Sequence, residues 1–426
     1  MKVLVVGGGG REHALVWGLA RSSAVGSVLC APGNAGIARE AACVPVAADD
    51  VPGLLDLVER ETVDLTVIGP EAPLVAGLAD ALEQRGRLVF GPTRAAARLE
   101  GSKAWAKALC ERHGIPAAGS RTASSMEEAL GALDEFEPPY VVKADGLAAG
   151  KGVVIAEDRT SAVEALSASL ERGAFGAAGE RVLVEEFLTG REVSAFALSD
   201  GADVVTVGFA RDFKRVGDGD AGPNTGGMGA YSPVPFLDRA TVERVVDEVL
   251  VRAVHAMASE GVRYRGVVYA GLMLTQDGPK VLEFNARFGD PETQVLVPRM
   301  EADLAELLLA CAQGTLGSRT VEESEAACVT VVLASGGYPG DYSTDLEITG
   351  LEEAAAVDDA LVFHAGTAER RGRVVTSGGR VLSVSGLGRD LAEARARAYE
   401  ACSRISFPGM HHRRDIAARA AEEERT

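Results

Sequence analysis

Two lysines that flank a segment of glycine and alanine are the first residues whose types and spacing suit chemistry. Lys143 ends a strand-like run, and Lys151 stands just before the next such run, which starts at Val153. Backbone N–H groups in a loop of this kind can cradle phosphate oxygens while two ammonium groups neutralise their charge. The loop is not a Walker A motif, because Gly152 follows the second lysine where that motif requires serine or threonine. The pattern predicts a hairpin over a polyphosphate, and the alternative is a mobile hairpin with a surface lysine.

A pair of oxygen ligands stands in a later strand-like run. Glu283 and Asn285 are two residues apart, so their side chains point to the same face of a strand. Such oxygens suit Mg²⁺, which takes one or two protein carboxylates together with substrate phosphates and water. Arg287 continues the same alternation and can meet a transferring phosphoryl group or a substrate carboxylate. The segment predicts a metal site, and the alternative is an edge strand with polar side chains in solvent.

Four glycines at residues 7–10 lie between a strand-like run and a helical one. Glycines there let the backbone approach a ligand, and the N-terminus of a helix favours an anion. A dinucleotide fingerprint requires a third glycine where Glu12 or His13 stands, and no ribose-binding acid follows at residues 31–34. The segment predicts phosphate binding in preference to NAD binding, with a plain tight turn as the alternative.

Acidic side chains close another strand-like run at Glu185 and Glu186, and the apolar pair Phe187 and Leu188 follows. Such a strand end can hold an adenine by its edge, with the carboxylate of Glu192 left for ribose hydroxyls. Acids at an exposed strand end are common, so this segment taken alone favours a solvated strand end.

A cluster of positive charge at residues 211–215 contains Asp212 and Lys214, and a glycine-rich loop follows at residues 217–230. Long loops without secondary structure are usually functional or disordered. Apolar flanks and Tyr231 argue against disorder. We therefore expect a contribution to a binding site, and the alternative is a surface hairpin.

The hydrophobic pattern predicts an α/β scaffold for these segments. Over the first hundred residues, short buried-strand patterns alternate with helical ones, which predicts a doubly wound parallel sheet. A helix over residues 103–113 follows, capped by Ser102 and ended by Gly114, and a second one is predicted from a capping box near Ser125 to about residue 136. Strand patterns dominate residues 140–287, and a fresh segment begins near residue 327.

Composition excludes several classes of function. The 426 residues carry a formal net charge of -19, whereas a nucleic-acid binder needs a broad basic surface. Six cysteines and six histidines show none of the paired spacings of zinc or redox sites. No signal peptide and no apolar run of roughly 18 residues, the length that crosses a membrane, is present. We expect a cytoplasmic protein without nucleic-acid or membrane partners.

Taken in order, these motifs resemble the ATP-grasp superfamily and, within it, the glycinamide ribonucleotide synthetase family. The resemblance covers essentially the whole chain, and the order of the motifs is more specific than any one of them. It is carried by residues 5–15, 31–36, 68–75, 90–93, 100–103, 143–152, 222–233, 283–294, 363–367 and 378–382.

The resemblance implies a fold and a reaction. The fold is an N-terminal domain over residues 1–101, an ATP-grasp core over 102–326 whose residues 121–192 form a mobile lid, and a small C-terminal α+β domain over 327–426. In the reaction, ATP phosphorylates the carboxylate of glycine, and the amine of 5-phosphoribosylamine displaces the phosphate. The enzyme is expected to be a monomer or a weak dimer.

The same resemblance implies site residues. The implied ATP-binding residues are Lys103, Lys143, Gly150, Lys151, Gly152, Glu185, Glu186, Phe187, Leu188 and Glu192. Glu283 and Asn285 are implied to bind Mg²⁺ or Mn²⁺. The implied substrate-binding residues are Gly8, Gly9, Gly10, Arg11, Asn34, Asn224, Gly226, Gly227 and Tyr231. The residues implied around the acyl transfer are Arg287, Asp212, Lys214 and Asp290.

Some positions depart from the family pattern. Arg211 and Phe213 stand where glutamine and histidine are common, Arg191 replaces a frequent glutamate, and Ala417 replaces a glycine. The nearest alternative function is another ATP-grasp carboxylate–amine ligase or carboxylase of purine metabolism. Two more distant alternatives are an NAD-dependent oxidoreductase, which the glycine spacing opposes, and a catalytically silent nucleotide-binding module.

Overall fold

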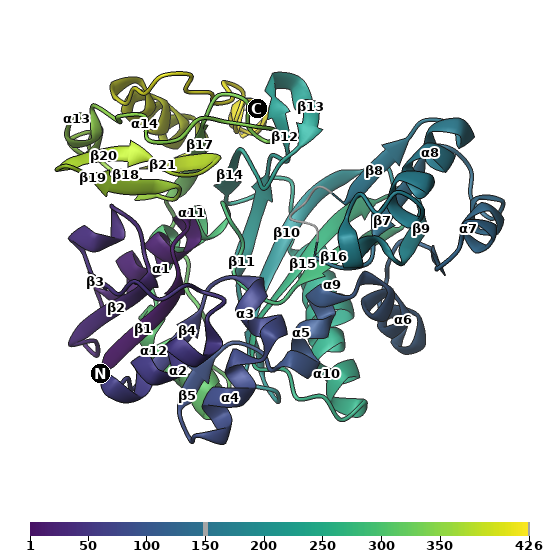
Figure 1. Cartoon of the computed structure of the whole chain (residues 1–426), viewed down its shortest axis with the longest axis horizontal. Helices are drawn as coiled ribbons and strands as arrows, with labels where there is room; N and C mark the ends of the chain where they lie inside the picture. The colour runs from purple at the N-terminus through teal and green to yellow at the C-terminus, as the bar shows by residue number, and fades with distance from the viewer. Residues whose placement is uncertain (148–151, 425–426) are drawn as a thin grey trace.

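The computed structural model describes residues 1–147 and 152–424, and its N-terminal part is a five-stranded parallel sheet in the order β3-β2-β1-β4-β5 (Figure 1). The strands are β1 (Lys2–Gly7), β2 (Ser27–Pro32), β3 (Ala42–Cys43), β4 (Leu65–Ile68) and β5 (Leu88–Phe90). The helices are α1 (Gly10–Leu19), η1 (Ile37–Arg39), α2 (Val51–Arg60), α3 (Glu71–Ala76), α4 (Leu78–Gln84) and α5 (Arg94–Gly101).

Successive residues of β1 face two different cores. Val3 and Val5 pack in one buried cluster with Leu15 of α1. Leu4 and Val6 pack in another, which contains Leu54 of α2. Apolar layers therefore cover both faces of the sheet, as the doubly wound prediction requires.

The helical pattern over residues 74–85 is two helices rather than one. Gly77, with φ of 91°, ends α3 and begins α4. A left-handed backbone interrupts the helical hydrogen bonds and favours glycine.

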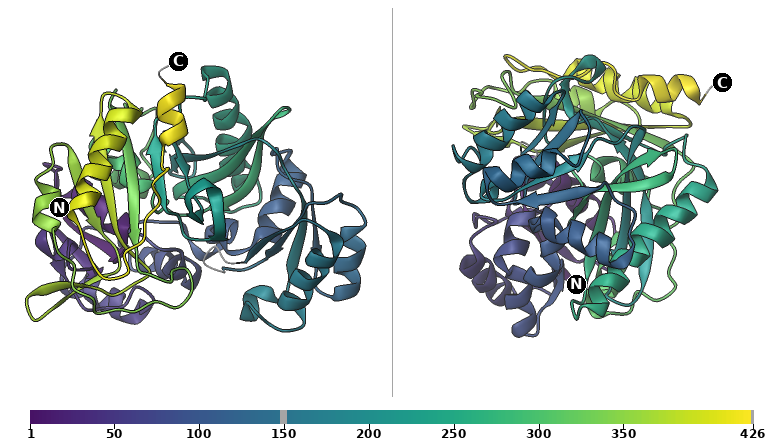
Figure 2. Two further views of the ribbon diagram at one scale, coloured as in Figure 1. Left: turned by 90° about the horizontal axis from the view of Figure 1, so that it is seen from above. Right: turned by 90° about the vertical axis from the view of Figure 1, so that its right-hand side faces the viewer.

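A four-stranded antiparallel sheet in the order β6-β9-β7-β8 forms the lid, which stands away from the rest of the molecule in Figures 1 and 2. The strands are β6 (Ser120–Ala123), β7 (Tyr140–Ala144), β8 (Val153–Ala156) and β9 (Val182–Glu186), and the helices are α7 (Met126–Leu133), α8 (Arg159–Leu170) and η2 (Gly176–Gly179). Ser125 caps α7 as predicted, but the helix ends three residues earlier than the pattern indicated. The lid has its own small core, in which Leu133 and Leu166 of the two helices meet Val142 and Val184 of the sheet.

The largest sheet has eight strands in the order β16-β15-β10-β11-β14-β17-β21-β18. They are β10 (Arg191–Ser199), β11 (Val204–Asp212), β14 (Gly229–Ser232), β15 (Gly266–Thr275), β16 (Gly278–Asn285), β17 (Ala327–Ala334), β18 (Ala360–His364) and β21 (Arg380–Gly388). Two hairpins stand apart from it, β12 (Arg215–Gly217) with β13 (Ala221–Asn224), and β19 (Thr367–Arg370) with β20 (Arg373–Thr376). The C-terminal strands thus extend the central sheet through β14.

Helices complete the core and the C-terminal part. Helix α6 (Lys103–His113) has the predicted Ser102 and Gly114 boundaries. Helices α9 (Arg239–Val245) and α10 (Arg252–Ser259) are joined by a π-helical turn, η4 (Val246–Val251). The remaining helices are η3 (Asp218–Asp220), α11 (Thr293–Leu296), η5 (Val297–Arg299), α12 (Leu304–Gln313), α13 (Leu351–Ala355), α14 (Leu391–Arg404) and α15 (Ala418–Glu423). Within the described residues, no helix is both long and apolar enough to cross a bilayer.

Candidate active site

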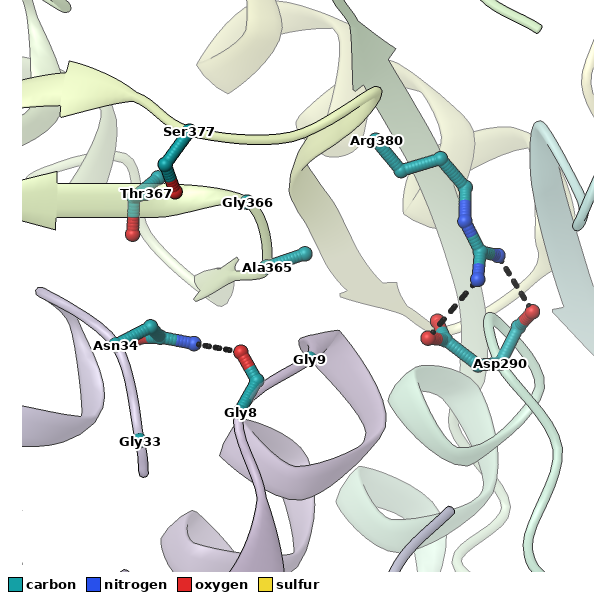
Figure 3. A pocket seen from close by; sticks show the side chains of 10 residues that line it. All are labelled: Gly8, Gly9, Gly33, Asn34, Asp290, Ala365, Gly366, Thr367, Ser377 and Arg380. Atoms are coloured by element: carbon teal, nitrogen blue, oxygen red, sulfur yellow. Dashed lines mark hydrogen bonds and ion pairs between the residues drawn. The ribbon is translucent and has the colours of Figure 1, made fainter. Parts of the chain in front are cut away.

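An open cavity of about 360 Å³ lies between the N-terminal sheet, the segment after β16 and the C-terminal strands (Figure 3). Two of its walls come from turns after β1 and β2, and a third comes from the turns around β19 and β20. Its lining consists of Gly8, Gly9, Gly33, Asn34, Asp290, Ala365, Gly366, Thr367, Ser377 and Arg380. Residues more than 300 positions apart in the sequence therefore share one binding surface.

The glycine-rich turn lines the cavity with backbone atoms, and its packing leaves no room for a side chain at these glycines. A Cβ on Gly8 would lie 2.5 Å from the carbonyl oxygen of Gly33, and a Cβ on Gly9 would lie 2.8 Å from Oε2 of Glu12. The turn runs directly into the N-terminus of α1, and such a terminus attracts negative charge. The cavity wall therefore suits an anionic group.

Asp290 lines the cavity with a carboxylate that is already bonded. It accepts hydrogen bonds from Nε2 of Gln294 at 2.7 Å and from Nη2 of Arg380 at 3.1 Å. Nη1 of Arg380 also donates to the carbonyl of Gly226 at 2.6 Å. Arg380 thus fastens the glycine-rich loop and Asp290 to the C-terminal strands. Gly227 packs onto Pro291 so closely that a Cβ there would collide with the proline ring.

A buried charge cluster lies at the lid end of the site. Oε2 of Glu185 accepts from Nζ of Lys143 at 2.9 Å and is 3.1 Å from Nζ of Lys107. Lys143 also donates to the carbonyl of Leu282 at 2.9 Å, which ties the lid strand to β16. Among the residues that the structure describes, Oε1 of Glu185 has no hydrogen-bond partner. Burial lowers the pKa of Lys107, and Glu185 opposes that shift. The cluster therefore places the ammonium groups of Lys143 and Lys107 and an available acceptor, Oε1 of Glu185, in a buried environment.

An apolar surface flanks this cluster where the lid chain returns to the core. Leu188 packs with Ala118, Met273 and Leu282 in a small separate cluster. A flat aromatic ring fits such a surface. The side chain of Phe187 is exposed, whereas Oε1 of Glu186 accepts from the backbone N–H of Gly119 and pairs with Lys280. Lys103 donates to the carbonyl of Gly146 at 3.2 Å, at the base of the lid loop.

Carboxylates and one lysine meet at the end of β11. Burial raises the pKa of the Asp212 carboxyl to about 7, against the opposing charge of Lys214. Neighbouring carboxylates add to the rise, and they belong to Glu292, Glu192 and Glu283. Nζ of Lys214 lies 3.1 Å from Oε2 of Glu192. Burial opposes the charge of Lys214, but Glu192, Asp212 and Glu283 outweigh burial and raise its pKa. Asp212 is thus poised to exchange a proton near neutral pH.

The predicted metal ligands lie at the end of β16. Burial favours the neutral acid at Glu283, but Lys214, Lys143 and Lys103 outweigh it and lower its pKa. Oδ1 of Asn285 accepts from Nη2 of Arg287 at 3.2 Å. Over the described ranges 1–147 and 152–424, no group of three histidine, cysteine or acidic side chains is arranged to hold an ion. One ionised carboxylate and one amide oxygen fit Mg²⁺ that receives its other ligands from phosphates and water.

Arg287 lies between the metal-ligand pair and the cavity. Its guanidinium is 3.0 Å from Oε1 of Glu100 and 3.3 Å from Oε2 of Glu71. These carboxylates outweigh burial and raise the pKa of Arg287, which remains a cation. Burial raises the pKa of Glu100.

Several predicted site residues do not face the cavity. Arg11 is buried, pairs with Glu12 at 2.6 Å and donates to the carbonyl of Phe288, so its side chain braces the turn. Tyr231 is 1% exposed and belongs to the main core. Asn224 belongs to the β12–β13 hairpin and is not among the residues that line the cavity. Gly150 and Lys151 lie outside the described residues, and Gly10 lies one residue beyond the cavity lining.

The structure also brings in residues that the sequence reasoning missed. They are Lys107 at the nucleotide end, Glu100 beside Arg287, and Thr367, Ser377 and Arg380 in the cavity. A signal was present for Glu100, Thr367 and Arg380, because residues 100–103, 363–367 and 378–382 belong to the motifs that resemble the family, and Ser377 directly precedes the last of these motifs. No local pattern marked Lys107.

Three of the departures from the family pattern, Arg211, Phe213 and Arg191, take part in contacts between a guanidinium and an aromatic ring. The guanidinium of Arg413 lies 4.8 Å from the ring centroid of Phe213, and that of Arg211 lies 5.8 Å from it. Arg191 lies 3.8 Å over Phe236 and pairs with Glu423 at 2.6 Å. These side chains fasten the end of β11 and β10 to the C-terminal tail.

The fold and the arrangement of lysines, acids and lid define the class of ATP-grasp enzymes. The chain matches the three domains of phosphoribosylglycinamide synthetase: the N domain over residues 1–100, the ATP-grasp (A) domain over 101–293 and the C domain over 328–419. It therefore belongs to the phosphoribosylglycinamide synthetase family.

Full-length relatives and solved structures agree with this assignment. Phosphoribosylamine–glycine ligases from Salmonella typhimurium and Caldanaerobacter subterraneus are 50% and 47% identical, with 100% and 98% of this chain and 100% of each relative covered. The crystal structure of the Thermotoga maritima phosphoribosylamine–glycine ligase superposes with a TM-score of 0.87 at 37% identity, over 98% of this chain and 100% of that one. A biotin carboxylase from Campylobacter jejuni shares the fold at 16% identity, with a TM-score of 0.74 over 96% of this chain and 92% of its own.

Proposed function

We propose that this enzyme joins glycine to 5-phosphoribosylamine at the expense of ATP and forms glycinamide ribonucleotide, ADP and phosphate. Family membership over the whole chain supports the reaction. The assignment of the reaction to this site is supported by one short segment, residues 283–290, which extends from the nucleotide end to the cavity. Glu283 stands among the lysines of the nucleotide end, Arg287 follows, and Asp290 lines the cavity. This segment therefore connects the place proposed for phosphoryl transfer with the place proposed for acyl transfer.

At the nucleotide end, ATP replaces the internal pairing of the charge cluster. Lys143, Lys103 and Lys151 neutralise its phosphates, and the Gly150–Gly152 backbone covers them. The adenine ring lies on the apolar surface around Leu188, and the free Oε1 of Glu185 accepts from its amino group. Glu186 and Phe187 border the ring, and Glu192 accepts from the ribose hydroxyls.

At the metal site, Glu283 and Asn285 would hold Mg²⁺ or Mn²⁺ between themselves and the phosphates of ATP. The ion, when bound, supplies positive charge that offsets the charge developing on the phosphates during transfer. Lys214, which already lies close to Glu192, contributes a fixed positive charge on the same side.

The reaction proceeds in two displacements. A carboxylate oxygen of glycine, oriented by Arg287, attacks the γ-phosphorus and ADP leaves, which gives glycyl phosphate. The amine nitrogen of phosphoribosylamine then attacks the carbonyl carbon of glycyl phosphate, and inorganic phosphate departs with the bonding electrons. Asp212 takes the proton that the nitrogen must lose, because its pKa of about 7 lets it hold a proton at neutral pH. Positioning and charge neutralisation supply most of the catalysis.

The cavity receives the phosphoribosyl group. The backbone of residues 8–10 and the N-terminus of α1 attract its phosphate, and the hydroxyls of Thr367 and Ser377 face the same space (Figure 3). Asn34 donates to the carbonyl of Gly8 at 2.9 Å and, together with Gly226 and Gly227, shapes the cavity.

The test is ADP release by the purified protein with ATP, Mg²⁺ and freshly prepared phosphoribosylamine, with and without glycine. We expect ADP only when glycine and the amine are both present, and we expect loss of release in a Glu283→Ala variant but not in Glu243→Gln, an exposed surface control. Release that requires another carboxylate or bicarbonate in place of glycine would refute the substrate and retain the ATP-grasp chemistry. Light scattering would test our accompanying expectation of a monomer or weak dimer, and cell fractionation that of a cytoplasmic enzyme.

A further inference from the structure

We infer that His13 is a positioning residue for the amine substrate: its imidazole holds the peptide of His364 and thereby fixes the turn at residues 365–367 against the cavity. The inference rests on the proposed function, because it assigns that turn to the phosphoribosylamine end of the site. His13 lies in α1 and does not line the cavity itself.

The N-terminal domain forms hydrogen bonds with both backbone polar groups of His364. Its N–H donates to Nδ1 of His13 at 2.7 Å, and its carbonyl accepts from Nδ2 of Asn34 at 2.8 Å. Asn34 also donates to the carbonyl of Gly8 at 2.9 Å. One connected set of hydrogen bonds therefore runs from the glycine-rich wall of the cavity to the opposite, C-terminal wall.

The acceptor role of Nδ1 determines the tautomer of His13. A neutral imidazole that accepts at Nδ1 carries its proton on Nε2, and this atom faces Oε1 of Glu40 at 3.4 Å. The ring of His364 continues the chain of contacts, because its Nδ1 lies 3.0 Å from Oγ1 of the cavity residue Thr367. Burial, aided by His13 and Arg39, lowers the pKa of His364 to about 3, so this ring stays neutral.

The turn and the two histidines are closely packed. A Cβ on Gly36 would collide with both imidazole rings, and a Cβ on Gly366 would lie 2.6 Å from Cα of Gly378. The edge of the His13 ring meets Phe363, with ring centroids 5.7 Å apart. Both histidines are buried, so the His364 N–H has no water to replace Nδ1 if that acceptor is lost. An unsatisfied buried donor is costly, and the turn would shift to relieve it.

Two substitutions of His13 separate the hydrogen bond from the packing. In His13→Asn, Oδ1 occupies the place of Nδ1 and can still accept from His364, whereas in His13→Gln the polar atoms reach only the place of Nε2. We expect the KM for phosphoribosylamine to rise roughly tenfold or more in His13→Gln and to stay within about threefold of the native value in His13→Asn. The KM for ATP and the kcat at saturating amine should change little in both variants.

A second readout does not depend on the substrate. Amide hydrogen exchange of the peptide around residues 362–367 should quicken in His13→Gln and remain near native in His13→Asn. Leu308→Ala, which removes a buried side chain from α12, is the control: it should lower Tm without raising the KM for the amine. Equal effects of the two His13 variants on KM and exchange would overturn the inference. If the native enzyme did not use phosphoribosylamine, the proposed function would fail, and the exchange difference alone would decide whether His13 fixes the turn.

Discussion

The two ends of the site are organised by opposite means. At the nucleotide end, Glu185 balances Lys143 and Lys107 at 2.9 and 3.1 Å, with all three side chains buried. At the amine end, apart from the single Asp290–Arg380 pair, backbone groups and the side chains of Asn34 and His13 set the shape through hydrogen bonds. Charges that balance one another can exchange partners when a charged ligand enters, whereas a hydrogen-bonded wall keeps its form. The first end therefore adapts to its ligand, and the second end is preformed.

Removal of the Glu185 carboxylate should have the largest effect, and it should act on the nucleotide end. Glu185→Gln leaves two buried lysines beside a neutral amide, which we expect to cost about 3–5 kcal/mol and to abolish ATP binding. Glu260→Gln is the matched control, because its pairs with Arg112 and His113 are partly exposed, and solvent screens such pairs so that they contribute little to stability. Denaturant unfolding and ATP titration would measure both effects. A native-like affinity for ATP in Glu185→Gln would contradict the adaptive role of the cluster.

Asp212 and Asp290, the two carboxylates implied around the acyl transfer, should differ in the kind of defect that their loss causes. Asp212→Asn is expected to lower kcat about 100-fold or more, as the loss of a general base does. In the native enzyme kcat should rise with pH around 7, because Asp212, whose pKa is about 7, accepts a proton only in its ionised form. Asp290 is bonded to Gln294 and Arg380, so Asp290→Asn should raise the KM for the amine and keep the pH midpoint. A pH–rate series would distinguish them, and an unchanged midpoint in Asp212→Asn would exclude it as the base.

A single methyl group should disturb the preformed end alone. Gly8→Ala places Cβ 2.5 Å from the Gly33 carbonyl oxygen, so the turn must move and the KM for phosphoribosylamine should rise roughly tenfold, with the KM for ATP unchanged. Gly131→Ala in α7 is the control, since open space surrounds that position and alanine favours a helix by roughly 0.5–1 kcal/mol. Initial-rate kinetics would measure both KM values. A rise in the KM for ATP together with that for phosphoribosylamine would contradict the expectation that only the amine end is disturbed.

A lower pH should reduce the stability of the protein gradually through His364, and this effect should be the smallest of the predicted effects. The pKa of His364 is lowered from 6.5 to about 3 in the folded protein, so only the unfolded chain takes up its proton as the pH falls below 6.5. Stability from this residue is complete above pH 6.5 and decreases by about 1.4 kcal/mol per pH unit toward pH 3. Thermal unfolding of the native protein and of His364→Gln between pH 7.5 and 5 should converge. Parallel curves would mean that His364 takes up its proton in the folded protein as well.

The sequence predicted the nucleotide end better than the amine end, for a physical reason. Lys143, Glu185 and Glu283 each stand at a strand end, where alternation and small neighbours reveal the direction of a side chain within a few residues. The cavity has no local pattern of this kind, because Asn34 and Thr367 meet only when two sheets pack together. Tyr231 shows the limit most clearly. It follows a functional-looking glycine loop, yet its position on β14 turns the ring into the core.

Some boundaries also depend on backbone geometry rather than on composition. Gly77 lies inside a continuous helical pattern and breaks it only because its backbone is left-handed. The pairing of β14 with β17 is likewise invisible in the pattern of either strand.

That pairing makes the C-terminal strands poor candidates for modular exchange. β14 bonds to Arg211 and Asp212 of β11 along one edge and to β17 along the other. Deleting the C-terminal segment would leave β14 as a bare sheet edge next to the proposed base, open to association with other chains. A split version of this enzyme, made for fragment complementation, should therefore be cut in the loop between α12 and β17 only if both pieces are produced together. Recombination between relatives should favour exchanging the core and C-terminal segments as one inherited block.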